Sequence, residues 1–317
     1  MKSFAFAAII AAASAYDSTK FMQWVAKHNR NYVSEQEFHQ RHMNFIQADA
    51  VIQVLNEQNN GTTFAHNHFS DMSDEEYRQM LGKKPIDRNE VVEFTYLPVT
   101  NEVENASVDW RNNGAVTAVQ DQGRCGSCWS FSSTGAMEGA HKIKTGSLLK
   151  LSEQQFVDCS TRNSGCNGGD QKVAFKYAES NAIMKEGAYS YTGVEGSCKY
   201  DSTKGKVSVS SIATVPNNDV SQLKAAINKQ PVAVSVDASC RAFSYYSSGI
   251  YTNSCGLNID HAILAVGYGG SGSSAYWIVK NSWSNSWGEE GYMRIAIQDG
   301  AGVCGIQSDY NTYPTTN

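Results

Sequence analysis

The chain has 317 residues, of which 41% are hydrophobic and 18% are charged. This balance excludes a generally disordered protein, and the length is sufficient for about two domain-sized units. The net charge is −5 at pH 7 and no long run of lysine and arginine is present, so we expect no nucleic-acid partner.

Residues 1–15 have the pattern of a secretory signal peptide. Lys2 supplies a positive charge, residues 4–12 are apolar, and residues 13–15 are small, as at a cleavage site. The apolar run is much shorter than the roughly 20 residues of a membrane span, which argues against the alternative of an anchor. Passage through an oxidising compartment favours disulfides among the eight cysteines and makes Asn60 and Asn105 candidates for glycosylation.

The cysteines divide the chain in two. All eight lie from Cys125 onward, so residues 16–103 form a cysteine-free segment before the remainder, residues 104–317. Between the two, Lys83 to Thr100 lacks a helical period and collects glycine, proline and polar residues, which is typical of an exposed linker. We expect a protease to cut within residues 100–107.

Two amphipathic helices are predicted before this linker. Apolar residues recur at helical spacing from Phe21 to Tyr32, and a second run repeats every seven residues through Phe38, Phe45 and Ile52. A segment of this size buries little surface alone, so we expect it to dock on the downstream domain, with an independent helical domain as the alternative. An N-terminal segment that ends in a loose linker is the arrangement of a removable inhibitor.

The same segment holds four histidines that raise a metal hypothesis, namely His39, His42, His66 and His68. No cysteine accompanies them and their spacings match no common zinc site. We therefore expect solvated or pH-titrating histidines, and no metal or other cofactor.

The downstream part predicts an α+β domain. Residues 128–144 have the pattern of a buried helix, with Gly146 as its stop. From Pro231 onward strand patterns dominate, at residues 232–236, 261–269, 276–279 and 292–297. A helical part followed by a β-rich part favours a cleft between two halves.

Three separated residues have the chemistry of a thiol nucleophile and its partners. In QGRCGSCWSF, residues 122–131, Cys128 opens the predicted helix, where the positive end of the helix dipole favours a thiolate. His261 begins an apolar strand and could serve as base and acid, although a satisfied core histidine is the alternative. The side-chain carbonyl of Asn281 could orient that imidazole, and Trp283 could cover their hydrogen bond or be an ordinary core residue.

These motifs make the chain resemble a papain-family cysteine protease of the cathepsin L-like branch, over almost its full length. The resemblance implies an α+β, papain-like two-subdomain fold, with a helical left half, an antiparallel β-barrel-like right half and the active-site cleft between them. A helical prosegment would precede it. It also implies Cys128 as nucleophile, His261 as base and acid, Asn281 as orienter, and the Gln122 amide with the Cys128 backbone N–H as oxyanion hole.

Prosegment motifs and disulfides extend the resemblance. The matched prosegment residues are Glu37, Arg41, Phe45, Ile52, Asn56, Asn67, Phe69 and Asp71. Ala48 and Ala65 replace an asparagine and a glycine that the family usually has. The implied disulfides, which the sequence alone cannot pair, are Cys125–Cys166, Cys159–Cys198 and Cys255–Cys304. Cys240 is left over and is interpreted as an inert thiol, with a reactive group or an intermolecular contact as alternatives.

By the same resemblance, Asp309 lines the floor of the main specificity pocket, which predicts tolerance for Arg at P2. The alternative is a carboxylate that faces solvent or pairs with a neighbouring cation. The other matched pocket positions are Asp170, Gln171, Ser235, Ile259 and Ala262. Gly168 and Gly169 match the backbone that binds extended substrate, where a side chain would block close approach. No long insertion interrupts the stretches that line the cleft, which favours an endopeptidase.

The predicted function is a monomeric cysteine endopeptidase made as a zymogen in the secretory pathway, acting in a lysosome-like vesicle or outside the cell. Its expected partners are protein and peptide substrates, its own prosegment as intramolecular inhibitor, and cystatin-like inhibitors. Acidic residues from Asp71 to Glu76 suggest that acid triggers activation by weakening prosegment docking. Two rival hypotheses are a non-catalytic homologue and a disulfide-built structural protein.

Overall fold

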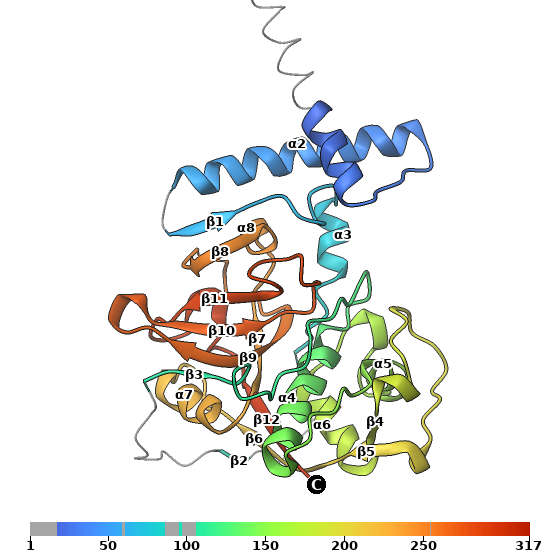
Figure 1. Ribbon diagram of the computed structural model, residues 1–317, viewed down its shortest axis with the longest axis vertical. Coiled ribbons are helices and arrows are strands. Elements are labelled where there is room, and N and C mark those ends of the chain that lie inside the picture. Colours follow the sequence, from blue (N-terminus) through green and yellow to red (C-terminus); the bar gives the residue numbers. More distant parts are fainter. Residues whose placement is uncertain (1–17, 59–60, 86–94, 97–105, 254) are drawn as a thin grey trace, which may run out of the picture.

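The computed structural model describes residues 18–58, 61–85, 95–96, 106–253 and 255–317 (Figure 1). The predicted signal peptide, both glycosylation candidates and most of the expected cutting region lie outside these residues. Residues 18–27 form a helix, and the further α-helices are α2 (Glu35–Glu57), α3 (Asp74–Gln79), α4 (Cys128–Thr145), α5 (Glu153–Cys159), α6 (Gln171–Ser180), α7 (Val220–Lys229) and α8 (Arg241–Ser244). Among the described residues, no helix is long and apolar enough to cross a membrane.

Most strands belong to the second half of the chain. They are β1 (Thr62–Phe64), β2 (Thr95–Tyr96), β3 (Val108–Asp109), β4 (Ile183–Met184), β5 (Gly205–Val207), β6 (Val209–Thr214), β7 (Val232–Val236), β8 (Tyr246–Tyr251), β9 (His261–Gly269), β10 (Tyr276–Lys280), β11 (Tyr292–Ala296) and β12 (Thr312–Thr316). Single 3₁₀ turns lie at Gly165–Asn167, Glu186–Ala188, Ser202–Lys204, Gly272–Ser274 and Val303–Gly305. The predicted strands 232–236, 261–269, 276–279 and 292–297 are thereby confirmed, with end positions that differ by one residue in two of them.

The β half is an open sheet rather than a barrel. Its strands follow the order β1-β8-β11-β10-β9-β7-β12-β6-β2, with β3 added on β9. In the part of the chain that the structure describes, no pairing joins the two ends of this order, so the half that we expected to be barrel-like is not a closed barrel. The central strands β9 and β7 are buried along their whole length, and α4 packs against β9.

The helical half consists of α4, α5 and α6, which lie beside the sheet on the right of Figure 1. The predicted helix 128–144 is confirmed as α4, and it ends at Gly146, whose φ of 79° is the left-handed conformation of a glycine helix stop. Trp129, Ala136 and Met137 of α4 are fully buried and pack on Phe156 and Phe175 of the neighbouring helices. This packing fixes the N-terminus of α4 where the two halves meet.

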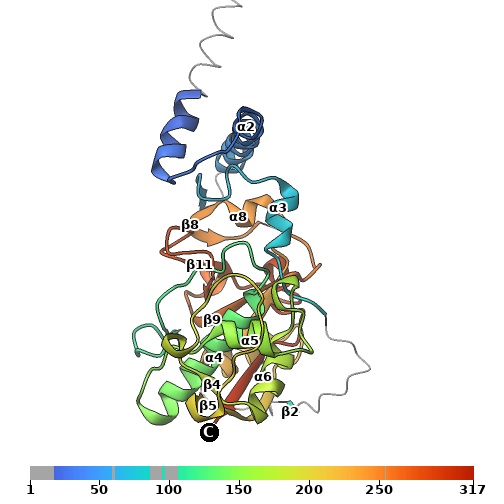
Figure 2. The same ribbon diagram turned by 90° about the vertical axis from the view of Figure 1, so that its right-hand side faces the viewer.

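The prosegment helices form a lobe across one end of the sheet (Figures 1 and 2). The first helix ends at residue 27, so the expectation that one helical face continues to Tyr32 is wrong. The ring of Tyr32 nevertheless stacks on Phe21, with centroids 6.2 Å apart. The second predicted helix is confirmed as α2, which begins after the Ser34 cap and buries Phe45 and Ile52.

The lobe docks on the downstream domain, so the alternative of an independent helical domain is wrong. Strand β1 pairs antiparallel with β8. The Asn67 side chain donates to the Ser244 carbonyl at 2.7 Å, and the Tyr77 hydroxyl donates to the Ala238 carbonyl at 2.7 Å. These backbone acceptors are buried, which makes each bond costly to leave unmade.

The four prosegment histidines do not converge on one point. The described residues contain no group of three or more histidine, cysteine and acidic side chains that could bind one. His39 is exposed, as expected, but three others lie against aromatic rings. His42 stacks on Phe21 and His66 on Phe45, with centroids 4.7 and 4.1 Å apart, and His68 is tilted against Phe69 with centroids 4.0 Å apart. These three side chains are half-buried, so the expectation of fully solvated histidines is wrong for them, while the alternative of pH-titrating histidines stays a prediction.

Candidate active site

Cys128 is the first residue of α4 and is fully buried. No acidic residue lies in the first turn, so nothing there opposes the attraction of the helix N-terminus for negative charge. Burial raises the pKa of the Cys128 thiol to about 11, although hydrogen bonds from the backbones of Ala262 and Gly82 act in the opposite direction. In this covered state the sulfur is therefore a neutral thiol.

His261 begins β9, and Asn281 follows β10, the strand that pairs with β9. This pairing brings the His261 Nε2 atom to 2.9 Å from the Asn281 side-chain oxygen. The indole of Trp283 stacks on the imidazole with centroids 4.5 Å apart, and both rings are fully buried. Since Nε2 is engaged by Asn281, Nδ1 is the imidazole nitrogen left for chemistry. Burial lowers the pKa of His261 to about 4, against the opposing hydrogen bond with Asn281.

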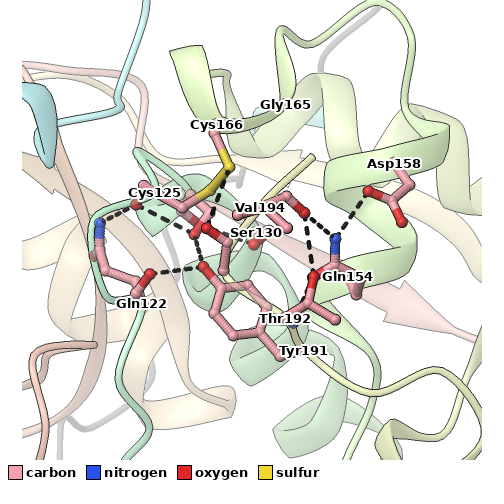
Figure 3. The surroundings of a disulfide bond; sticks show 12 residues. Gln122, Cys125, Ser130, Gln154, Asp158, Gly165, Cys166, Tyr191, Thr192 and Val194 are labelled. Atoms are coloured by element: carbon pink, nitrogen blue, oxygen red, sulfur yellow. Dashed lines mark hydrogen bonds between the residues drawn. A yellow bond between two sulfur atoms is a disulfide. The ribbon is translucent and has the colours of Figure 1, made fainter. Parts of the chain in front are cut away.

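Gln122 is fully buried, beside the disulfide that anchors the loop before α4 (Figure 3). Its side-chain oxygen accepts the Ser282 hydroxyl at 2.7 Å, and its amide nitrogen donates to the Cys125 carbonyl at 2.9 Å. The same nitrogen donates at 2.8 Å to the backbone carbonyl of Met80, which belongs to the prosegment. The side-chain amide of Gln122 thus already donates a hydrogen bond to a peptide carbonyl oxygen.

The chain from Met80 to Lys84 runs between the two halves and bonds to both. From the helical half, Gly169 donates to the Gly82 carbonyl at 2.8 Å and accepts the Lys84 backbone N–H at 2.9 Å. From the sheet half, the Asp260 carbonyl accepts the Lys83 backbone N–H at 2.9 Å. A Cβ on Gly82 would lie 1.8 Å from the Gly126 carbonyl oxygen, so only glycine fits at this crossing.

Lys83 is buried among carboxylates. Its Nζ atom lies 2.8 Å from Asp170 Oδ2 and 3.1 Å from Asp309 Oδ2. The expectation that residues from Lys83 onward form an exposed linker is therefore wrong at its first residue, because the two acids supply the partners that a buried ammonium needs. Of the two interpretations of Asp309, the structure shows the alternative, a carboxylate that pairs with a cation, and that cation is Lys83. The position of Asp309 at the floor of a specificity pocket stays a prediction.

The remaining matched positions surround this pair. The Gln171 amide donates to the Ser235 hydroxyl at 3.2 Å, which links α6 to β7. Ala262 packs in the same buried cluster as Cys128. Ile259 is half-buried. Gly168 has a φ of 111°, and a Cβ there would lie 2.7 Å from the Gly82 carbonyl oxygen.

Comparisons with known proteins agree with this geometry. Residues 104–314 match the papain family cysteine protease, and residues 21–77 match the cathepsin propeptide inhibitor domain (I29). The chain belongs to the papain family of cysteine proteases. This papain-family protease is 41% identical to cysteine proteinase 5 of Dictyostelium discoideum, covering 91% of this chain and 90% of that protein, and 40% identical to papaya proteinase 4 of Carica papaya, covering 94% and 86%.

Solved precursor structures extend the agreement to the prosegment. Digestive procathepsin L 3 from the larval midgut of Tenebrio molitor matches the papain-family protease with a TM-score of 0.85 at 36% identity, covering 94% of this chain and 98% of that chain. The recombinant stem bromelain precursor matches with a TM-score of 0.86 at 35% identity, over 94% of this chain and 98% of that chain. The expected family and enzyme class are thereby confirmed: this protein is a cysteine protease, a hydrolase, that carries an inhibitory propeptide.

The cysteines of this papain-family protease pair as the resemblance implies, in the disulfides Cys125–Cys166, Cys159–Cys198 and Cys255–Cys304. Cys240 is free and half-buried, and its sulfur lies 2.7 Å from that of Cys255. Burial raises the pKa of the Cys240 thiol, against the opposing hydrogen bond from the Tyr251 hydroxyl, which fits the interpretation of an inert thiol.

Sequence reasoning missed the prosegment residues that fill the cleft of this papain-family protease. Met80, Gly82 and Lys83 stand where helical periodicity ends, and that loss of pattern indicated a linker. A signal was nevertheless available: a pocket predicted to contain Asp170 and Asp309 calls for a cation, and Lys83 is the first lysine after the matched prosegment motifs.

Proposed function

We propose that this papain-family protease is an endopeptidase in which Cys128 is the nucleophile and His261 its base and acid. The observation that carries the proposal is the bond between His261 Nε2 and Asn281, which directs the imidazole and leaves Nδ1 for the thiol. Once the prosegment leaves, water reaches the site and the burial that keeps both groups neutral is relieved. The thiol proton then passes to His261, and the thiolate lies at the N-terminus of α4.

Acyl transfer follows from these positions. The Cys128 sulfur attacks the scissile carbonyl carbon, and the negative charge moves to the carbonyl oxygen, where the Gln122 amide and the Cys128 backbone N–H stabilise it. His261 gives its proton to the leaving amine, and water, deprotonated by the same imidazole, then hydrolyses the thioester. The contact of Gln122 with the Met80 carbonyl supports this role, because that donor already binds a peptide oxygen in the precursor.

The test is labelling with a thiol-directed epoxide after acid maturation. We expect one label per chain on Cys128, and none on Cys128→Ala, while Cys240→Ser is labelled like the wild type. Activity lost with His261→Ala in a matured, folded enzyme would support the base. Labelling of Cys128 without peptide hydrolysis would instead favour the non-catalytic homologue.

The pocket floored by Asp309 is proposed to accept Arg at P2 as well as apolar residues. The ion pair that Asp309 makes with Lys83 supports this, because it places a cation of the chain itself on the carboxylate. In matured enzyme, Asp309→Ala should lose hydrolysis of a peptide with Arg at P2 selectively over one with Leu. An equal loss on both peptides would refute the assignment.

The chain organisation is proposed from the sequence: a signal peptide at residues 1–15, a prosegment at 16–103 and the peptidase domain at 104–317, with maturation within residues 100–107. The enzyme would travel the secretory pathway and act as a monomer in a lysosome-like vesicle or outside the cell. Proteins and peptides would be its substrates, and cystatin-like proteins its inhibitors. Mass spectrometry of the secreted precursor would test the first boundary, and mass spectrometry of the matured protein would test the second.

A further inference from the structure

Two carboxylates from separate elements converge on one nitrogen in the cleft. Asp170 is the N-cap of α6, where its Oδ1 atom accepts the Lys172 backbone N–H at 2.7 Å, while Oδ2 lies 2.8 Å from Lys83 Nζ. Asp309, which precedes β12, provides the second carboxylate at 3.1 Å. The side chains of Lys83 and Asp170 are only 3% and 4% exposed. Burial at this level is tolerated only when the charges have partners, so the site is built around a cation.

The balance of charge changes when the prosegment leaves. Among the described residues, Lys172 is the other cation that faces these acids; it is buried, and its Nζ atom lies 5.0 Å from the centre of the Tyr310 ring. With Lys83 present, Asp170 and Asp309 face two ammonium groups. Without it they keep Lys172 alone, so one negative charge in the pocket lacks a partner.

The arrangement suits an ammonium group better than a guanidinium group. In the precursor, Lys83 Nζ has three donors and meets three acceptors. Asp170 and Asp309 remain after maturation, whereas the Lys84 carbonyl, at 3.0 Å, leaves with the prosegment. A guanidinium binds most strongly through two parallel bonds to both oxygens of one carboxylate. Asp170 cannot offer that pair of oxygens, because one of them caps α6.

We propose that Asp170 and Asp309 together form a site for one ammonium group, which the precursor fills with its own Lys83 and the matured enzyme offers to a lysine at P2 of a substrate. The proposal rests on the proposed function and names Asp170 as a second determinant of specificity. Maturation then exchanges an internal lysine for a substrate lysine at the same two carboxylates.

The first test measures kcat/KM of matured enzyme on peptides that differ only at P2, with lysine, arginine or norleucine, the last being a lysine-like chain without the ammonium. We expect lysine to be preferred over norleucine, and Asp170→Asn to reduce that preference on the order of tenfold. Asp299→Asn, which alters an exposed carboxylate, should leave the preference unchanged. An unaltered preference in Asp170→Asn, with Cys128 still labelled by the epoxide, would overturn the proposal and spare the proposed function. Absence of labelling in the wild type would instead refute the proposed function.

The second test uses the full precursor at neutral pH. Lys83→Met keeps the length of the side chain but removes its charge, and should raise the rate of epoxide labelling of Cys128 about tenfold or more, whereas Lys84→Met, at an exposed position, should not. The double variant Lys83→Met with Asp170→Asn should label more slowly than Lys83→Met, because one unpaired carboxylate is removed. Equal rates for Lys83→Met and Lys84→Met would overturn the role of Lys83. Both lysines precede the expected cutting region, so maturation removes either substitution and leaves the same enzyme. Equal activity of the matured variants would therefore show that each precursor had folded.

Discussion

Gly82→Ala tests whether the prosegment blocks the active site by close backbone passage. The added Cβ would lie 1.8 Å from the Gly126 carbonyl oxygen, 2.3 Å from its carbon and 2.8 Å from its Cα, all of them backbone atoms that cannot turn away. Ordinary contact needs about 3.5 Å. The segment would therefore have to lift away, breaking its three backbone bonds with Gly169 and Asp260. At about 1 kcal/mol each, these bonds amount to about 3 kcal/mol, or roughly a hundredfold shift toward an open cleft.

The assay is the rate at which a thiol-directed epoxide labels Cys128 in intact precursor at neutral pH. We expect Gly82→Ala to label roughly a hundredfold faster than the wild type, and Gln79→Ala, an exposed change on α3 three residues earlier, to label at the wild-type rate. Acid maturation of each precursor, followed by the same labelling, shows whether the peptidase domain has folded. If Gly82→Ala precursor labels as slowly as the wild type, the crossing at Gly126 is not what closes the site.

Four further changes test the chemistry and the control of this zymogen. Gln122→Ala should lower kcat on the order of a hundredfold with a smaller effect on KM, measured on matured enzyme, if its amide binds the oxyanion. Hydrogen bonds from Arg41 hold the pKa of Glu76 below its usual range, and Glu76→Gln removes this carboxylate. The variant precursor should therefore mature at a higher pH than the wild type. The maturation rate should rise only a few-fold, because the Arg41–Glu76 pair is partly exposed. Asp71→Asn should not speed maturation at neutral pH, because burial raises the pKa of that carboxyl and the charged form is already disfavoured when docked. Burial lowers the pKa of Lys280 to about 8. The free energy of unfolding of the mature enzyme, measured in urea relative to Lys280→Met, should therefore rise between about pH 8 and 10.5. A difference in unfolding free energy that stays constant over this range would contradict the shift.

Much of the fold could be predicted because its elements carry strong periodic patterns. The helix that starts at Cys128 and the strand that starts at His261 are long and apolar, and their limits coincide with glycines or catalytic motifs. That the sheet stays open could not be predicted, because pairing between the two edge strands of a sheet leaves no periodic trace in the sequence of either strand. The end of the first helix was also misplaced, since the spacing of Tyr32 fits a helix even though its ring reaches the cluster from a loop.

The candidate site also has a part that the sequence predicts and a part that it does not. Cys128, His261 and Asn281 are far apart in the sequence, and a family signature was needed to group them; the structure supplies the pairing of β9 with β10 that brings the last two together. Contacts that the prosegment makes in the cleft, such as Lys83 with Asp309, depend on two segments meeting across more than 200 residues. Neither segment has a pattern that identifies the other, so the meeting point follows from tertiary packing alone.

We expect acid to activate this zymogen only through groups whose protonation favours release, and the direction of each pKa shift indicates which groups these are. The raised pKa of Asp71, caused by burial, means that the docked form binds the proton more tightly, so acid strengthens docking through this group and the trigger expected from the sequence is wrong there. Burial lowers the pKa of His68 to about 3, so the stability it contributes is complete above pH 6.5 and is lost progressively as the pH falls from 6.5 to about 3. At Asp309, burial is outweighed by Lys83 and Lys172, which lower its pKa to about 2, so the pocket ion pair persists through this range. We therefore expect protonation of His68 to loosen the lobe as the pH falls, while the ion pair of Lys83 with Asp309 should persist through the same range.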